Sequence, residues 1–315
     1  MASFSYNARI TSVENRSIIM ALTEASLGVG SIIGGYTSGP LITRFGVPAL
    51  FGITLGINAC IAIIAFFMTD ILKNDSGKLS MSDIFGFRRL VDAATAMFHR
   101  RVGYRRMLIQ MSFASFFGVY CGMILSSSVG FLYFVKNIGF SLDLYSIYMG
   151  SSGALITITS TIVLVIVKYL HLNQRGAAII GAGLCSIGFT INSIGKPIWL
   201  PWLGMVFMAT QGLPFAVLRT YQSTLARGDE LARLFAYEAL LQIVLTQLTQ
   251  IFGSNFYIWT VEFWPGATLA LAAGCVIFSI IMMVLSIHVQ KWNDQLEYQT
   301  LEEPQTENPK EALTS

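Results

Sequence analysis

Charged side chains are scarce in this chain of 315 residues. Asp, Glu, Lys and Arg together make up 12% of it, whereas soluble domains carry about 25%. Hydrophobic residues make up 54%, and the mean hydropathy is +0.63. These values exclude an ordinary soluble domain and place the chain in the membrane class.

Motifs for hydrolysis and metal binding are also lacking. No nucleotide-binding P-loop, HExxH or GxSxG pattern occurs. The four cysteines show no CxxC or Cys/His spacing, and each falls inside an apolar run. We therefore expect no enzymatic activity, no cofactor and no metal. The net charge of +3 gives no indication of nucleic-acid binding.

Long apolar runs are abundant instead. About 20 apolar residues suffice to cross a bilayer core as a helix, and a backbone in lipid must satisfy its own hydrogen bonds. The sequence therefore predicts an all-α integral membrane protein with about eight transmembrane helices. The predicted spans are residues 17–41, 47–69, 107–134, 144–168, 176–195, 198–219, 234–259 and 266–289.

The basic residues are distributed unequally between the predicted loops. Of the 20 Lys and Arg residues, Arg44, Lys136 and Lys196 fall on one side of the membrane, and the other 17 fall on the opposite side. Loops rich in Lys and Arg stay in the cytoplasm. We therefore predict that both termini are cytoplasmic.

The spans fall into two groups. Residues 1–69 contain two helices, residues 70–106 form a basic cytoplasmic linker, and residues 107–289 contain six helices. Apolar residues near helical spacing allow the linker to be either a helix on the membrane surface or a plain solvated segment. Residues 290–315 are polar and acidic, so we expect a disordered cytoplasmic tail.

One carboxylate lies inside the first apolar run. Glu24 stands in ALTEASLGVGSIIGGYTSG, residues 21–39, with no cation nearby in sequence. A charge at the centre of a span costs about 2.5–3.5 kcal/mol on insertion scales, so such residues tend to face a cavity and to be functional. A carboxyl group there could take up and release a proton, as a proton-coupling site requires. The alternative is that Glu24 lies near the inner end of the helix and reaches water.

Glycines occur at short intervals in the same run. Gly30 and Gly34 form a GxxxG pattern, as do Gly35 and Gly39, and Gly28 precedes them. Small residues four positions apart let a neighbouring helix approach closely. We expect helix packing at Gly28, Gly30, Gly34 and Gly35, either as a static contact or as a sliding contact during transport.

Polar side chains form a stripe along the seventh span. Glu238, Gln242, Thr246 and Gln250 are spaced by four, and Gln247 lies beside them. Positions four apart share a helix face, and buried polar groups need partners or water. The stripe therefore either lines an aqueous path or forms hydrogen bonds to a neighbouring helix.

The sixth span is interrupted. Gln211, Gly212 and Pro214 stand within it, and Pro removes a helical hydrogen bond. Broken helices near mid-membrane often mark substrate sites. Arg219 ends the run, and its depth alone indicates an anchor at the inner membrane surface. Tyr120 is one of many hydroxyl residues of the third and fourth spans, which either bind a polar substrate or allow close packing.

The segment ENRSIIMALTEASLGVGSIIGG (14–35) resembles the major facilitator superfamily, and more narrowly the proton-coupled folate transporter family (solute carrier family 46). FGFRRL and MFHRRVGYRRM within 85–107, and PFAVLRTYQSTLA and DELARLFAYEAL within 214–240, carry the same resemblance. It implies that the eight spans correspond to helices five to twelve of twelve, so that the first four helices are missing. The two predicted helices of 1–69 would then close the N-terminal half, and 107–289 would be the C-terminal half.

The resemblance also implies roles for individual residues. Glu24 falls on the family's functional glutamate of helix five, and Arg219 falls on its functional arginine of helix ten. The implied activity is proton-coupled import of organic anions by alternating access. Arg9 stands where the family usually has Asp, and Arg88 stands where histidine occurs, which argues against a folate substrate.

Two hypotheses for the function follow. In the first, the protein is a secondary transporter in the plasma or lysosomal membrane that imports a small organic, anionic solute together with protons. Glu24 would carry the proton, and the solute would be bound or gated by Arg219, Glu238, Gln211, Gln242, Gln247 and Tyr120. In the second, the chain is a truncated, non-transporting membrane protein that packs with or regulates a full-length relative.

Overall fold

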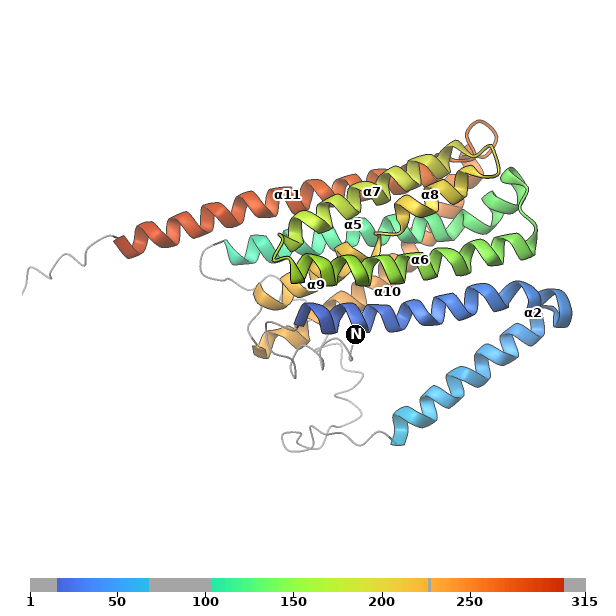
Figure 1. Ribbon diagram of the computed structural model, residues 1–315, viewed down its shortest axis with the longest axis horizontal. Helices are drawn as coiled ribbons and strands as arrows, with labels where there is room; N and C mark the ends of the chain where they lie inside the picture. The colour runs from blue at the N-terminus through green and yellow to red at the C-terminus, as the bar shows by residue number, and fades with distance from the viewer. Residues whose placement is uncertain (1–15, 68–103, 226–227, 303–315) are drawn as a thin grey trace, which may run out of the picture.

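The computed structural model describes residues 16–67, 104–225 and 228–302, and within these ranges every regular element is a helix (Figure 1). The predicted basic linker lies almost entirely outside the described residues, as does the end of the chain from 303. In chain order the elements are α2 (Arg16–Phe67), α5 (Arg105–Leu132), the π-helix η1 (Tyr133–Ile138), α6 (Leu142–Tyr169), α7 (Gln174–Ile194), α8 (Leu200–Met208), α9 (Gly212–Leu225), α10 (Gly228–Thr260) and α11 (Ala267–Glu302).

Helix α2 contains two of the predicted spans. It has 52 residues, which at about 1.5 Å per residue is about 78 Å, far more than a bilayer core of about 30 Å. Gly46 interrupts it with φ 78° and ψ 170°, a left-handed φ that glycine tolerates because it has no Cβ. Figure 1 shows the chain doubling back at this point. We call residues 16–45 the first arm of α2 and residues 47–67 its second arm.

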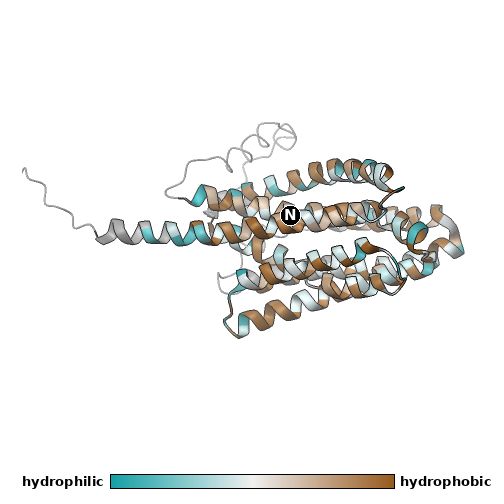
Figure 2. Ribbon diagram, turned by 90° about the horizontal axis from the view of Figure 1, so that it is seen from above, coloured by the Kyte–Doolittle hydropathy of each residue, from teal (hydrophilic) through white to brown (hydrophobic). Residues whose placement is uncertain are grey.

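The helices are long and apolar enough to cross a membrane. Seven candidate spans occur among the described residues, one of which, Gly28–Ile63, runs through both arms of α2. Large apolar side chains are exposed on the outside of the bundle, including Phe51, Ile57 and Ile243. Hydrophobic residues cover most of each helix, and hydrophilic ones gather in the extended C-terminal part of α11 (Figure 2). Such a surface fits lipid and would be unfavourable in water.

The three basic residues predicted on one side of the membrane can be located in the fold. Arg44 directly precedes the bend at Gly46, Lys136 lies in η1, and Lys196 lies in the α7–α8 connection. All three are at the same end of the bundle, where Figure 1 also shows the connection between α10 and α11. The three basic residues that the sequence assigned to one side of the membrane therefore lie together.

The first arm of α2 packs against α6 along a seam of small residues. A Cβ atom added to Gly35 would lie 2.6 Å from the Cα of Gly150, and one added to Gly28 would overlap the side chain of Thr157. The hydroxyls of Tyr36 and Ser151 lie 2.8 Å apart across the same seam. Since atoms this close leave no room for a side chain, the two helices approach each other through their backbones.

The seam uses only some of the predicted packing glycines. Gly28, Gly35 and Gly39 are separated by seven and four residues, so they lie on one face of a helix with about 3.6 residues per turn. Gly30 and Gly34 fall on the opposite face, and nothing described lies within 4 Å of a Cβ added at either position. Within the described part of the chain, the packing predicted for Gly30 and Gly34 is therefore wrong. A GxxxG spacing does not by itself identify the face that contacts a neighbouring helix.

Helix α5 is the centre of the rest of the bundle and packs against α9, α10 and α11. A Cβ added to Gly122 would lie 2.9 Å from the carbonyl oxygen of Ala272, so α5 and α11 also approach closely. The buried hydroxyls of Ser115 and Ser279 are 2.8 Å apart and satisfy each other. This part of the bundle is close-packed around apolar side chains such as Phe116 and Val276.

The C-terminal end of α11 differs from the prediction. The helix continues to Glu302, past the start of the tail that we expected to be disordered from residue 290. Residues 290–302 include helix-forming Lys, Gln, Leu and Glu and no proline, and Pro304 stands two positions after the last helical residue. The prediction of a disordered tail is therefore wrong for residues 290–302.

The α2–α6 seam predicts different effects for two neighbouring glycines. We expect Gly35→Ala to lower the free energy of unfolding by about 1–3 kcal/mol, because its methyl group overlaps the backbone of α6. Gly34→Ala is the matched control, with open space at the same methyl group, and it should leave stability unchanged or slightly improved. Thermal unfolding of the two purified variants in detergent measures the difference. Equal effects at the two positions would contradict the seam.

Candidate functional site

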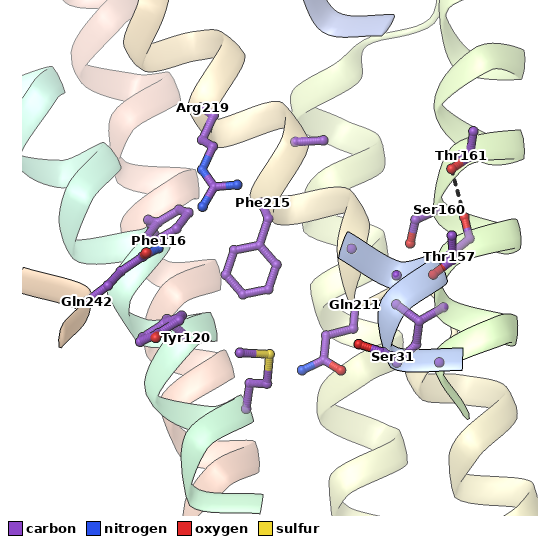
Figure 3. Close-up of a pocket in the computed structure, with 16 residues that line it drawn as sticks. Ser31, Phe116, Tyr120, Thr157, Ser160, Thr161, Gln211, Phe215, Arg219 and Gln242 are labelled. Carbon is purple, nitrogen blue, oxygen red and sulfur yellow. Dashed lines mark hydrogen bonds between the residues drawn. The ribbon is translucent and has the colours of Figure 1, made fainter. Parts of the chain in front are cut away.

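A cavity of about 390 Å³ lies between the first arm of α2 and helices α5, α6, α9 and α10 (Figure 3). Six residues singled out from the sequence line it: Gly28, Tyr120, Gln211, Gly212, Arg219 and Gln242. They come from segments that are far apart in the chain, and the fold brings them together. The cavity is therefore formed by both groups of spans that the linker separates.

The interruption predicted in the sixth span is present beside the cavity. Helix α8 ends at Met208, α9 begins at Gly212, and Gln211 occupies the turn between them. Breaking a helix frees backbone groups, and Ser160 Oγ donates to the freed carbonyl of Ala209 at 3.3 Å. The side chain of Gln211 is left at the cavity surface, where Figure 3 shows it below Phe215.

Arg219 forms an ion pair with Glu238 in the wall of the cavity. Its Nε donates to Glu238 Oε1 at 3.1 Å, and the two side chains are 6% and 0% exposed. The guanidinium also lies over the ring of Phe116, 5.1 Å from its centroid, where the π-face favours a cation. The prediction from depth alone that Arg219 is an anchor at the membrane surface is therefore wrong. The side chain points inward from α9 and contacts Phe116 of α5 and Glu238 of α10.

Aromatic rings make one wall of the cavity. Phe116 and Tyr120 are stacked one helical turn apart on α5, with centroids 6.2 Å apart. Phe215 of α9 meets Phe116 edge to face, with centroids 5.2 Å apart. Tyr120 holds its position through a 2.7 Å hydrogen bond between its hydroxyl and that of Thr246 on α10. The wall is apolar, with the Arg219 charge next to it.

Hydroxyl groups from α2 and α6 make the opposite wall, with Ser31, Thr157, Ser160 and Thr161. Thr161 Oγ1 donates its proton to the backbone carbonyl of Thr157 at 2.8 Å, and Ser160 donates to Ala209 as described above. Because a hydroxyl has one proton and two lone pairs, the oxygens of Ser160 and Thr161 can still accept hydrogen bonds. This wall therefore offers hydroxyl oxygens that can accept hydrogen bonds from a ligand.

Other residues singled out from the sequence lie away from the cavity surface. Glu238 lies behind Arg219 and does not line the cavity. Gln247 and Gln250 are exposed on the outside of α10. The polar stripe is therefore divided: Gln242 faces the cavity, Thr246 bonds α5, and the last two residues face outward. Glu24 lies in α2, but its side chain is outside the described part of the structure.

Several cavity residues were not found from the sequence. Phe116 and Phe215 are indistinguishable from packing aromatics in a chain with 22 Phe. The available signal was spacing, since Phe215 lies four residues from both Gln211 and Arg219 and so shares their face. Among the described residues, no group of three or more His, Cys, Asp or Glu side chains could hold a metal ion.

A cavity within an apolar helical bundle, with a broken helix and a buried ion pair in its wall, defines a polytopic membrane protein. The model of the Major Facilitator Superfamily matches residues 1–242. The chain belongs to this superfamily.

Curated relatives narrow the similarity to the SLC46 family. The chain is 24% identical over 286 residues to the lysosomal proton-coupled steroid conjugate and bile acid symporter SLC46A3 of Homo sapiens, covering 89% of this chain and 61% of the relative. The proteins of the same name from Pongo abelii and Mus musculus are 25% and 24% identical over 286 and 274 residues, covering 89% and 86% of this chain and 61% and 59% of those proteins. The chain thus spans about three fifths of the length of these relatives.

The Arg219–Glu238 pair predicts a strong coupling between the two residues. We expect Glu238→Gln to lower the free energy of unfolding by about 3–5 kcal/mol, because it removes the carboxylate that neutralises a buried guanidinium. Arg219→Gln combined with Glu238→Gln should cost less than the sum of the two single changes, since neither charge then remains. A double-mutant cycle of thermal stability in detergent measures this.

Glu262→Gln provides the control for the cycle, since Glu262 is an exposed carboxylate just after α10. Its effect should stay within about 0.5 kcal/mol. Strict additivity of the Arg219 and Glu238 changes would mean that the two charges do not depend on each other.

Proposed function

We propose that the protein is a proton-coupled secondary transporter that moves an amphipathic organic anion by alternating access. The observation that carries this proposal is Arg219, a buried guanidinium that lines a cavity inside an apolar helical bundle. Intramembrane charges are costly and tend to serve a substrate or ion pathway. A guanidinium can bind a carboxylate or sulfate through two parallel hydrogen bonds.

The chemistry of the two cavity walls favours one class of anion as the substrate. Phe116, Tyr120 and Phe215 suit a flat apolar body, and the hydroxyl wall with Ser160 and Thr161 suits hydroxyl donors on the body's other side. A volume of about 390 Å³ is within the range of about 300–1,000 Å³ that ligand pockets commonly have. Steroid conjugates and bile acids, which the names of the relatives carry, have this combination of features.

Charge balance supports coupling to protons. Arg219 and Glu238 are neutral as a pair, so an anion that binds beside them adds an uncompensated charge to an apolar environment. A proton taken up with the anion restores neutrality. We propose Glu24 as the group that carries this proton, and the Arg219–Glu238 pair as the element that responds to the anion.

The domain organisation and location are part of the same proposal. Residues 1–69 and 107–289 would act as the two parts that move relative to each other, joined by the linker 70–106. Both termini would be cytoplasmic, as the distribution of Lys and Arg indicates. The lysosomal relatives favour a lysosomal membrane over the plasma membrane.

Uptake into vesicles containing the purified full chain tests the proposal. We expect accumulation of a radiolabelled steroid sulfate when the side from which it enters is acidic, and loss of accumulation when a protonophore removes the pH gradient. Glu24→Gln should abolish accumulation but keep exchange of labelled for unlabelled sulfate, because Gln resembles a permanently protonated carboxyl group. Glu262→Gln serves as the control and should retain pH-driven accumulation.

Two results would overturn the proposal in different ways. Retained pH-driven accumulation in Glu24→Gln would remove Glu24 from the coupling mechanism. Absence of both accumulation and exchange in the unaltered chain would favour the second hypothesis, a membrane protein that does not itself transport.

A further inference from the structure

Helix α9 and the turn before it present three chemically different groups to the cavity. Gln211 lies in the turn before the helix, and Phe215 and Arg219 follow at intervals of four residues. All three line the cavity, and Figure 3 shows the phenyl ring between the amide and the guanidinium. At about 1.5 Å per residue, the Cα atoms of Gln211 and Arg219 are about 12 Å apart.

The amide of Gln211 is in an unusual position for a buried polar group. The residue is 5% exposed, and its Nε2 has no hydrogen-bond partner among the described residues. Buried donors are nearly always paired, and a donor without an acceptor is unfavourable. Because this side chain borders a cavity, a ligand could supply the missing acceptor.

Two hydroxyls of the opposite wall are not available as hydrogen-bond donors to a ligand. Ser160 and Thr161 donate their protons to the backbone carbonyls of Ala209 and Thr157, so toward a ligand they act as acceptors. The amide of Gln242 lies near Phe116, at the Arg219 end of the cavity (Figure 3). Gln211 is thus an amide donor at the other end.

We propose, on the basis of the transport function above, that Gln211 recognises the end of the substrate opposite to its charge. The substrate is an elongated apolar anion: its charged group binds at Arg219, its body contacts Phe215 and Phe116, and an oxygen at its far end accepts a hydrogen bond from Gln211 Nε2. Gln211 is then a specificity-determining residue, because an otherwise identical anion without that oxygen leaves the amide donor without an acceptor.

Two steroid sulfates test this assignment. One carries the sulfate on the first ring and a keto group on the last ring, and the other lacks the keto group. For the unaltered full chain in lipid nanodiscs, we expect the keto sulfate to bind about tenfold more tightly by calorimetry. In Gln211→Leu the two affinities should become equal and match that of the unaltered chain for the sulfate without the keto group.

Gln250→Leu is the matched control, because it makes the same change at an exposed position on α10, and it should keep the tenfold preference. Equal affinities in the unaltered chain, or a preference that persists in Gln211→Leu, would overturn the role of Gln211 while leaving transport intact. If Gln211→Leu does not fold, the two affinities of the unaltered chain still decide. Failure of both sulfates to bind or to be taken up would instead overturn the proposed transport function, and the assignment with it.

Discussion

The ion pair between Arg219 and Glu238 is the constraint on which the rest of the site depends. A guanidinium and a carboxylate 3.1 Å apart, both nearly inaccessible, are tolerated inside an apolar bundle because each neutralises the other. The electrostatic energy of such a pair responds strongly to any further charge, since few water molecules screen it. An anion that enters the cavity therefore changes the energy of the whole site, which a site exposed to water would not do.

The helices of the bundle are joined to one another by different kinds of contact. Helices α5 and α11 pack closely through small residues and are joined by the Ser115–Ser279 hydrogen bond. Helix α9 instead begins at a break. Gln211 in the turn before it, and Phe215 and Arg219 on its inner face, therefore line the cavity without continuing the line of α8. The first arm of α2 packs beside the cavity through a seam of glycines and through the Tyr36–Ser151 and Ser38–Ser146 hydrogen bonds. The cavity and the helix contacts thus lie on adjacent surfaces.

The sequence predicted the membrane class and the spans because lipid imposes one rule on every crossing helix, an apolar run of sufficient length. It also predicted the break near Pro214 and the position of Arg44, Lys136 and Lys196 on one side. It could not predict which glycine face of α2 meets α6, or that Arg219 turns inward rather than reaching the surface. Those features depend on the position of a neighbouring helix, and helical periodicity shows only which residues share a face. The aromatic wall could not be predicted for the same reason, since Phe116 and Phe215 differ from other phenylalanines only in their neighbours.

The central claim is that the site remains electrically neutral when an anion binds. Calorimetric binding of a steroid sulfate to the full chain, repeated in buffers with different heats of ionisation, measures the number of protons taken up with the anion. The account predicts uptake of about one proton per anion near neutral pH. Binding with no proton uptake would contradict it, because the added charge would then remain uncompensated within the bundle.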